Sequence, residues 1–161
     1  MEGRTRSRET GLARFRVGDW VRVAGSRRRA RIASFYAEEE GAAILDRTVL
    51  GFRSWHSSEL RKIDPPEPPV VFNLRRPGRV ASGRRILYIG RPSRWGNPFQ
   101  NGTREENIRR FEAFLRRNDK LLAKLEDLSG YALGCYCKPK PCHGDVIVKV
   151  WKERFGKGER C

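Results

Sequence analysis

The first part of the chain alternates between apolar and polar positions in short runs, a pattern typical of half-buried β-strands. The alternation starts with DWVRVAG at residues 19–25, continues through RARIASFY and GAAILD, and ends with GFRSWHSSELRKI. The acidic turn AEEEG interrupts it at residues 37–41. Several short strands within about fifty residues predict a small, strongly bent β-barrel over residues 15–63.

The pattern changes after residue 70, where short apolar runs alternate with helical periodicity. The runs VVFNL, RILYIG and YALGCYC predict buried strands. A capping box of Thr103 and Glu106 predicts the start of a helix over residues 104–117, and further helices are expected over residues 119–128 and 144–155. Strands separated by helices predict an α/β layered domain of three strands and three helices.

A proline-rich segment separates the two patterns. IDPPEPPVV at residues 63–71 has four prolines in the five positions 65–69, which favours a stiff, extended linker. We therefore predict an α+β chain of two modules. The predicted parts are a flexible basic N-terminus (1–14), a barrel (15–63), a linker (64–69), an α/β domain with a Cys/His cluster (70–156) and a tail (157–161).

The formal net charge is +16, from 35 Lys and Arg against 19 Asp and Glu. Such a charge favours a polyanionic partner, and nucleic acid is the commonest one inside cells. The alternative is that the charge only sets solubility. No run reaches the ~20 apolar residues of a membrane span, and the N-terminus lacks the apolar core of a signal peptide. We expect no membrane association and a cytoplasmic location, in the host cytoplasm if the source is viral.

Three of the four cysteines lie within eight positions, in the stretch GCYCKPKPCHGD at residues 134–145. Cys135 and Cys137 are two positions apart at a strand end, so they point to the same side. The KPKP turn then returns the chain to Cys142 and His143. Three thiolates and an imidazole suit Zn²⁺, so one interpretation is a zinc site of these four residues.

The same stretch allows other chemistry. Cys142 starts a predicted helix, where exposed N–H groups and the helix dipole lower a thiol pKa and attract anions. Lys138 and Lys140 add positive charge for a phosphate. Cys142, His143 and Asp145 are therefore candidate catalytic residues. The alternatives are inert buried thiols and an Asp145 that only caps the helix.

A second candidate site is the loop YIGRPSRWGNPF at residues 88–99, which directly follows a predicted strand. Arg91 and Arg94 suit phosphate, Trp95 can stack on a base, and Asn97 can read a base edge. These residue types predict a nucleotide site. The alternative is that Trp95 fills the core and that Asn97 satisfies the backbone of the loop.

The N-terminal pattern FRVGDWVRV followed by ILDRTVLGFRSWHSSELRKI resembles the SH3-like barrels of phage and translation-related proteins over residues 15–63. This resemblance implies nucleic-acid or peptide binding and does not choose between them. Arg27, Arg28 and Arg29 lie at a predicted hairpin tip that suits phosphate contacts, or they form only a solvated turn.

The motifs VFNLRR, YIGRPSRWGNPF, REENIRRFEAFLRR and LGCYCKPKPCHGDVI, in that order, resemble the domain of unknown function 4326 family over about residues 70–152. Its members occur in bacteria, archaea and their viruses. The resemblance implies that the following positions carry the family signature: Asn73, Gly90, Arg91, Trp95, Gly96, Asn97, Pro98, Cys135, Cys137, Cys142, His143, Gly144 and Asp145. Tyr131 and Ala132 depart from the basic residue that members often show there. The family has no agreed activity.

Together these patterns predict a basic nucleic-acid-binding accessory protein from a phage or prokaryote, with a Cys/His site that can hold Zn²⁺. One alternative is an enzyme that acts on a nucleotide or nucleobase and uses Arg91, Trp95 and Asn97 to hold it. A second alternative is a structural or interaction protein with no catalytic role.

Overall fold

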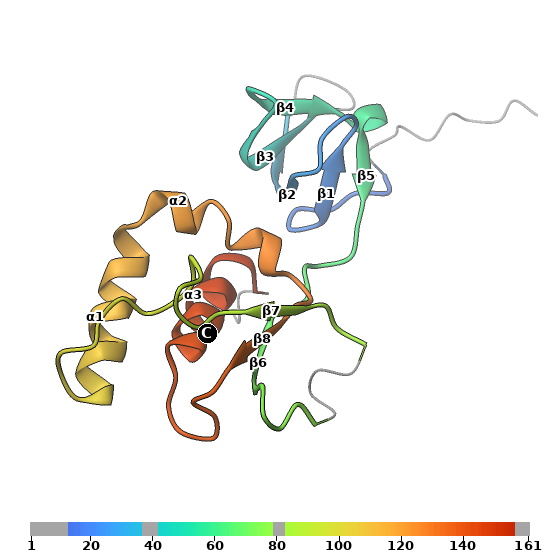
Figure 1. Ribbon diagram of the computed structural model, residues 1–161. Helices are drawn as coiled ribbons and strands as arrows, with labels where there is room; N and C mark the ends of the chain where they lie inside the picture. Colours follow the sequence, from blue (N-terminus) through green and yellow to red (C-terminus); the bar gives the residue numbers. More distant parts are fainter. Residues whose placement is uncertain (1–12, 37–41, 79–82, 157–161) are drawn as a thin grey trace, which may run out of the picture. The chain divides into compact units, whose positions relative to one another are not determined.

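The computed structural model describes residues 13–36, 42–78 and 83–156. Most of the predicted N-terminal segment, the acidic turn, the predicted tail and Cys161 lie outside these residues. The chain divides into two compact units between Pro65 and Pro66, inside the predicted linker (Figure 1). We call them the N-terminal and the C-terminal unit.

The N-terminal unit is a curled antiparallel sheet with the strand order β4-β3-β2-β1-β5 (Figure 1). Its elements are β1 (Trp20–Val23), β2 (Arg29–Phe35), β3 (Ala42–Val49), β4 (Phe52–His56), the 3-10 turn η1 (Ser57–Glu59) and β5 (Leu60–Lys62). The pairing of β2 with β3 shifts register between Ile32 and Ser34, and such irregularities bend strands. The predicted short strands are confirmed.

One apolar cluster fills the curl of this sheet. Its buried members are Phe15, Val21, Val23, Ala30, Ile32, Ala43, Leu45, Val49 and Leu60, with Phe35 and Trp55 packed against them. Val21 and Val23 face the cluster while Arg22 between them is exposed, as strand alternation requires.

The C-terminal unit contains the three predicted strands, which form a parallel sheet, together with helices (Figure 1). Its elements are β6 (Val70–Asn73), β7 (Ile86–Tyr88), α1 (Arg104–Arg117), α2 (Asp119–Leu122), the 3-10 turn η3 (Glu126–Leu128), β8 (Ala132–Cys135) and α3 (His143–Phe155). The strand order is β6-β8-β7. None of the helices in the described part of the chain has the length and apolar character needed to cross a membrane.

Two elements of this unit differ from the sequence prediction. RILYIG was expected to be a buried strand, but β7 is an edge strand whose Ile86 is 56 % exposed and whose Tyr88 is 38 % exposed. The expected helix over residues 119–128 ends at Leu122. It gives way to i→i+3 hydrogen bonds, including the one from Leu128 N–H to Leu125 C=O, which keep both leucines buried.

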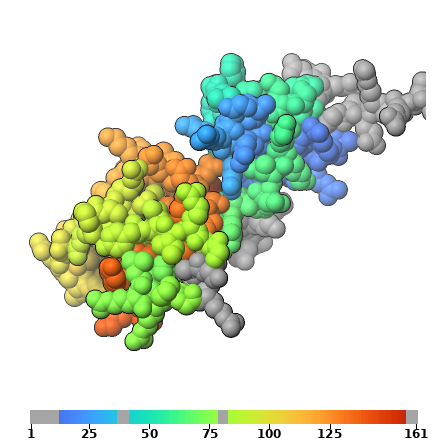
Figure 2. All heavy atoms as spheres, turned by 45° about the vertical axis from the view of Figure 1, so that its right-hand side comes forward, coloured from blue at the N-terminus to red at the C-terminus, as the bar shows by residue number. Residues whose placement is uncertain are grey.

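The carboxyl ends of the three parallel strands meet at one edge of the sheet. The loop that follows β7, yellow-green in Figure 2, spreads over much of the visible face of the C-terminal unit. Helix α3 approaches the sheet closely at Gly144, where a Cβ would lie 2.7 Å from Cδ1 of Ile89 and 3.0 Å from Cγ1 of Val71. In parallel α/β sheets this edge, beside helix N-termini, is the usual place for a ligand site.

Candidate metal centre and ligand cavity

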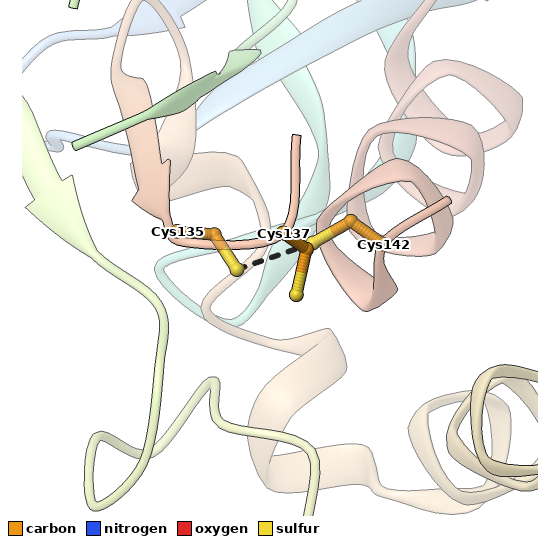
Figure 3. Close-up of side chains that lie close together, drawn as sticks. All are labelled: Cys135, Cys137 and Cys142. Carbon is orange, nitrogen blue, oxygen red and sulfur yellow. Dashed lines mark hydrogen bonds between the residues drawn. The ribbon is translucent and has the colours of Figure 1, made fainter. Parts of the chain in front are cut away.

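Three cysteines gather at this edge and form what we call the cysteine cluster. Cys135 ends β8, Cys137 lies in the following turn, and Cys142 is the N-cap of α3. Their sulfur atoms all lie within 4.8 Å of one another, and those of Cys135 and Cys142 are 3.3 Å apart (Figure 3). Tetrahedral Zn²⁺ with Zn–S bonds of about 2.3 Å spaces its sulfurs about 3.8 Å apart. Three of the four predicted ligands can thus hold a metal ion.

A capping box fixes the position of Cys142. Its sulfur accepts a hydrogen bond from the Gly144 N–H at 3.3 Å, and its own N–H donates to Oδ2 of Asp145 at 3.0 Å. The other carboxylate oxygen of Asp145 lies 2.6 Å from Nζ of Lys138. Asp145 is exposed and has both oxygens engaged, which favours the capping role over the catalytic one.

The two closest thiols share a proton. The hydrogen bond from the Cys142 thiol lowers the pKa of Cys135 to about 5, and the Cys137 N–H acts in the same direction. The pKa of Cys142 is raised, mainly because its thiol takes part in that hydrogen bond and secondly because the thiol is buried. The helix N-terminus was expected to lower the pKa of Cys142, but the hydrogen bond with Cys135 and burial outweigh the Gly144 N–H and raise it.

His143 lies beside the cluster with its ring held in place. Its Nε2 is 2.8 Å from the carbonyl oxygen of Ile89, and because a carbonyl only accepts, Nε2 carries the proton. The ring also meets Phe111 edge-on, with centroids 5.2 Å apart. Its Nδ1 is 3.6 Å from the sulfur of Cys142. No nitrogen of His143 belongs to the group of ligand atoms within 4.8 Å of one another.

The cysteine cluster and His143 line a cavity of about 580 Å³, which we call the cavity. Its other lining residues are Tyr88, Gly90, Arg91, Asn97, Phe99, Gln100, Gly102, Arg104, Asn107, Ile108, Tyr136 and Pro141. The described lining therefore contains two guanidinium groups and no carboxylate. Such a lining attracts anions into the space beside the thiols.

The predicted nucleotide loop contributes part of this wall. Arg91 and Asn97 line the cavity, whereas Arg94 is exposed outside it. Trp95 is only 3 % exposed, so its ring packs in the interior and offers no face to a base. Asn97 donates to the carbonyl of Asn107 at 3.0 Å and accepts from the Phe99 N–H at 2.9 Å, so its amide holds the loop.

The remaining predicted phosphate-binding residues lie outside the cavity lining. Lys138 pairs with Asp145, and the exposed Lys140 donates its N–H to the carbonyl of Cys137 within the turn. In the N-terminal unit, the connection between β1 and β2 carries Arg27 and Arg28, both exposed. Arg29 is the first residue of β2.

Two tyrosines on the cavity wall were missed by the sequence analysis. Tyr88 ends β7, and Tyr136, which is 57 % exposed, directly follows β8. Their rings meet edge to face with centroids 6.2 Å apart, and the guanidinium of Arg75 lies 5.5 Å from the Tyr136 centroid. Each lies near the carboxyl end of a predicted strand, which is the sequence signal that would have found them.

The fold and site define a parallel α/β unit with a three-cysteine cluster at the carboxyl ends of its strands. Residues 72–153 match the family described as Domain of unknown function (DUF4326). This match spans just over half of the chain, so the chain belongs to that family and the resemblance seen in the sequence is confirmed.

A curated relative is the "Uncharacterized 12.4 kDa protein in nrdA-td intergenic region" of Enterobacteria phage T4. It is 44 % identical over 73 residues, which cover 42 % of this chain and 68 % of that protein. No solved structure matches the chain.

Proposed function

We propose that this protein is a nucleic-acid-binding accessory protein of phage or prokaryotic origin whose C-terminal unit binds a nucleotide of the strand in the cavity. The observation that carries the proposal is the composition of the cavity wall. It combines exposed Tyr88 and Tyr136 with Arg91 and Arg104 and has no carboxylate among its described residues. The phage T4 relative supports the origin.

Each part of a nucleotide has a matching group on this wall. Arg91 and Arg104 are exposed and suit a phosphate, which guanidinium groups bind through two parallel hydrogen bonds. Tyr136 offers an exposed ring for a base, and one such stack contributes about 1–3 kcal/mol. The net charge of +16 adds attraction that does not depend on sequence.

Fluorescence anisotropy with labelled single-stranded and duplex oligonucleotides tests the proposal. We expect binding that weakens steeply with salt and differs little between sequences. Replacing both Arg91 and Arg104 with alanine should weaken binding more than replacing the exposed Lys124 and Arg154, which removes the same charge away from the cavity. No binding at ~50 mM salt, or affinity that does not change with salt, would rule the proposal out.

The aromatic contribution needs its own variant pair. Tyr136→Leu should weaken binding by about tenfold, while Tyr136→Phe retains most of it because stacking requires only the ring. Tyr36→Leu is the matched control, since Tyr36 is 44 % exposed on the N-terminal unit. Equal losses from the Tyr36 and Tyr136 variants would argue against base stacking at the cavity.

We further propose that the cysteine cluster holds Zn²⁺. The proposal is supported by three thiols within 4.8 Å of one another. Thiols are soft ligands, which bind zinc in preference to hard cations such as Mg²⁺ and Ca²⁺. Elemental analysis of the purified chain should find one zinc ion per molecule. Thiol titration should find fewer reactive thiols in the zinc-loaded chain than after chelation, and an equal count in both would contradict zinc binding.

A second candidate function is catalysis on the bound nucleotide or nucleobase. The favouring observation is that the low-pKa thiol of Cys135 and the ring of His143 line the same cavity as the arginines. Incubation with nucleotides, followed by chromatography of the products, tests it. Turnover that is lost in Cys135→Ser and kept in Lys140→Ala would support catalysis by the cluster.

We propose that the N-terminal unit is an SH3-like barrel whose exposed Arg27 and Arg28 add phosphate contacts. The curled five-stranded sheet and its apolar core support this assignment. We also propose that the two units fold separately. Limited proteolysis should then cut near the proline-rich segment and leave a stable C-terminal fragment, whereas uniform degradation of that fragment would contradict separate folding.

A further inference from the structure

The cysteine cluster supplies only three ligand atoms for an ion that takes four. Building on the proposed zinc site, we propose that Cys135, Cys137 and Cys142 alone hold the ion and that its fourth coordination position opens into the cavity. An oxygen of an anionic ligand, such as the phosphate of a nucleotide, fills that position. Metal sites with three protein ligands and an exchangeable fourth are those that bind or activate a ligand, whereas structural zinc sites are closed.

His143 is the residue that would otherwise close the site. A fourth tetrahedral ligand must lie about 3.6–3.8 Å from each of the three sulfurs. Its Nδ1 meets this distance to Cys142 at 3.6 Å, but its nitrogens are not within 4.8 Å of all three sulfurs. The 2.8 Å hydrogen bond to Ile89 and the edge contact with Phe111 hold the ring at this distance.

The neighbouring carboxylate is equally unable to close the site. Asp145 has one oxygen on the N–H of Cys142 and the other on Lys138, and it does not line the cavity. The described lining contains no other carboxylate or imidazole beyond His143. The fourth ligand therefore comes from outside the described protein groups, and the cavity is the space that all three cysteines share.

Charge decides the class of that ligand. Three thiolates around one divalent cation carry one net negative charge, which Arg91 and Arg104 on the same wall more than offset. Guanidinium groups bind planar or tetrahedral oxyanions. A phosphate monoester can bind the ion through one oxygen and the two arginines through its other oxygens. The nucleoside attached to that phosphate then extends toward Tyr88 and Tyr136.

Cobalt-substituted full-length protein tests the open position, because Co²⁺ reports its coordination through its visible absorption. Azide is the first probe and deoxyadenosine 5′-monophosphate the second. We expect both to shift the visible bands in a saturable way, and Arg91→Ala to weaken the response to the nucleotide more than the response to azide. Visible absorption bands that do not shift on addition of either probe would overturn the proposal.

The role of His143 separates the open site from a closed one. His143→Gln should lower Co²⁺ affinity by no more than about 10-fold, whereas Cys137→Ser should lower it by at least about 100-fold, since ligand loss exceeds the effect of losing a supporting group. X-ray absorption of the zinc-loaded wild-type chain gives the same answer without a variant. Three sulfurs and one oxygen would support the proposal, and an imidazole in the fourth position would overturn it.

The outcomes also distinguish this proposal from the zinc proposal on which it rests. Tight metal binding with an imidazole as the fourth ligand would support the zinc proposal but overturn the open position, because the site would then be closed and structural. Failure of the chain to bind either Zn²⁺ or Co²⁺ would overturn both proposals. Nucleotide binding that is unchanged by metal removal would also overturn the open site, because the ligand would then not need the ion.

Discussion

Helices α1 and α3 of the C-terminal unit begin with the same backbone arrangement but with different side chains. At α1, Thr103 accepts the N–H of Glu106 at 3.2 Å, and the Glu106 carboxylate accepts the N–H of Thr103 at 2.8 Å. At α3, Cys142 and Asp145 take the two roles. Both boxes satisfy the N–H groups that a helix start leaves unpaired.

The difference lies in what the N-cap side chain does besides capping. Thr103 is exposed, whereas Cys142 is 1 % exposed and its sulfur contacts Cys135. Serine, threonine, aspartate and asparagine are the preferred N-caps, and cysteine is not among them. A thiol at this position therefore indicates a use for the sulfur that a hydroxyl could not supply. The predictions below test whether the two helix starts really differ in this way.

The largest expected effect is on metal binding. Cys142→Ser keeps a good N-cap but removes a sulfur, so zinc affinity should fall by at least about 100-fold. Competition with a chromophoric chelator measures it. Thr103→Ser, the same kind of cap exchange at α1, should leave zinc affinity unchanged. Retention of full affinity in Cys142→Ser would remove the sulfur from the ligand set.

The next effect concerns the glycine near each helix start. Gly144→Ala places a Cβ 2.7 Å from Ile89 and should destabilise the unit by about 1–3 kcal/mol through overpacking. Gly102→Ala places a Cβ 2.9 Å from Oε2 of Glu106 and 3.3 Å from Oδ1 of Asn107, both at the ends of exposed or half-exposed side chains that can shift, and should have less effect. Thermal unfolding of the two full-length variants measures the contrast. Equal losses would mean that α3 is not pressed against the sheet.

A smaller effect is expected from the cap of α1 itself. Thr103→Ala leaves the N–H of Glu106 without its partner and should lower the stability of α1 by about 1 kcal/mol, with no change in zinc affinity. Amide hydrogen exchange of peptides covering residues 104–117 measures the local loss. Faster exchange in α3 to the same extent would show that the two helix starts are coupled and not independent.

The smallest effect is a pH dependence confined to α1. The hydrogen bond from the Thr103 N–H lowers the pKa of Glu106 below its usual 4.5. A lowered folded-state pKa stabilises the fold above the unfolded value, and this contribution is lost as the pH falls through the folded value. The stability difference between wild type and Glu106→Gln should therefore shrink below about pH 4.5. A difference that stays constant down to pH 2 would contradict this role.

Features set by neighbouring residues were predictable from the sequence. The Thr103–Glu106 capping box and the return of the turn that brings Cys142 beside Cys135 follow from residue type and spacing. The exposure of β7 was not predictable, because an apolar run has the same pattern in a central strand and in an edge strand. Only the order β6-β8-β7 assigns Ile86 and Tyr88 to the edge.

The site was predictable in its members and not in their roles. Cys135, Cys137 and Cys142 were identified together, but which thiol is ionised depends on which sulfur donates, and that is decided by distances of a few ångströms. Trp95 has the residue type of a stacking platform, yet it is buried, while Tyr136 faces out. Burial of an aromatic ring in a loop depends on contacts that sequence spacing does not encode.

The central strand of the C-terminal sheet is also the last one in the sequence. Among the strands that the structure describes, β6 and β7 each pair with β8, where Ala132 lies opposite both Val70 and Ile86, and they do not pair with each other. During synthesis, neither early strand has a partner until residues 132–135 leave the ribosome. The sheet must then close over long chain separations, which slows folding. A fragment that stops before Ala132 keeps the N-terminal sheet but cannot form the C-terminal one. A premature stop there therefore leaves β6 and β7 as unpaired apolar segments that favour aggregation.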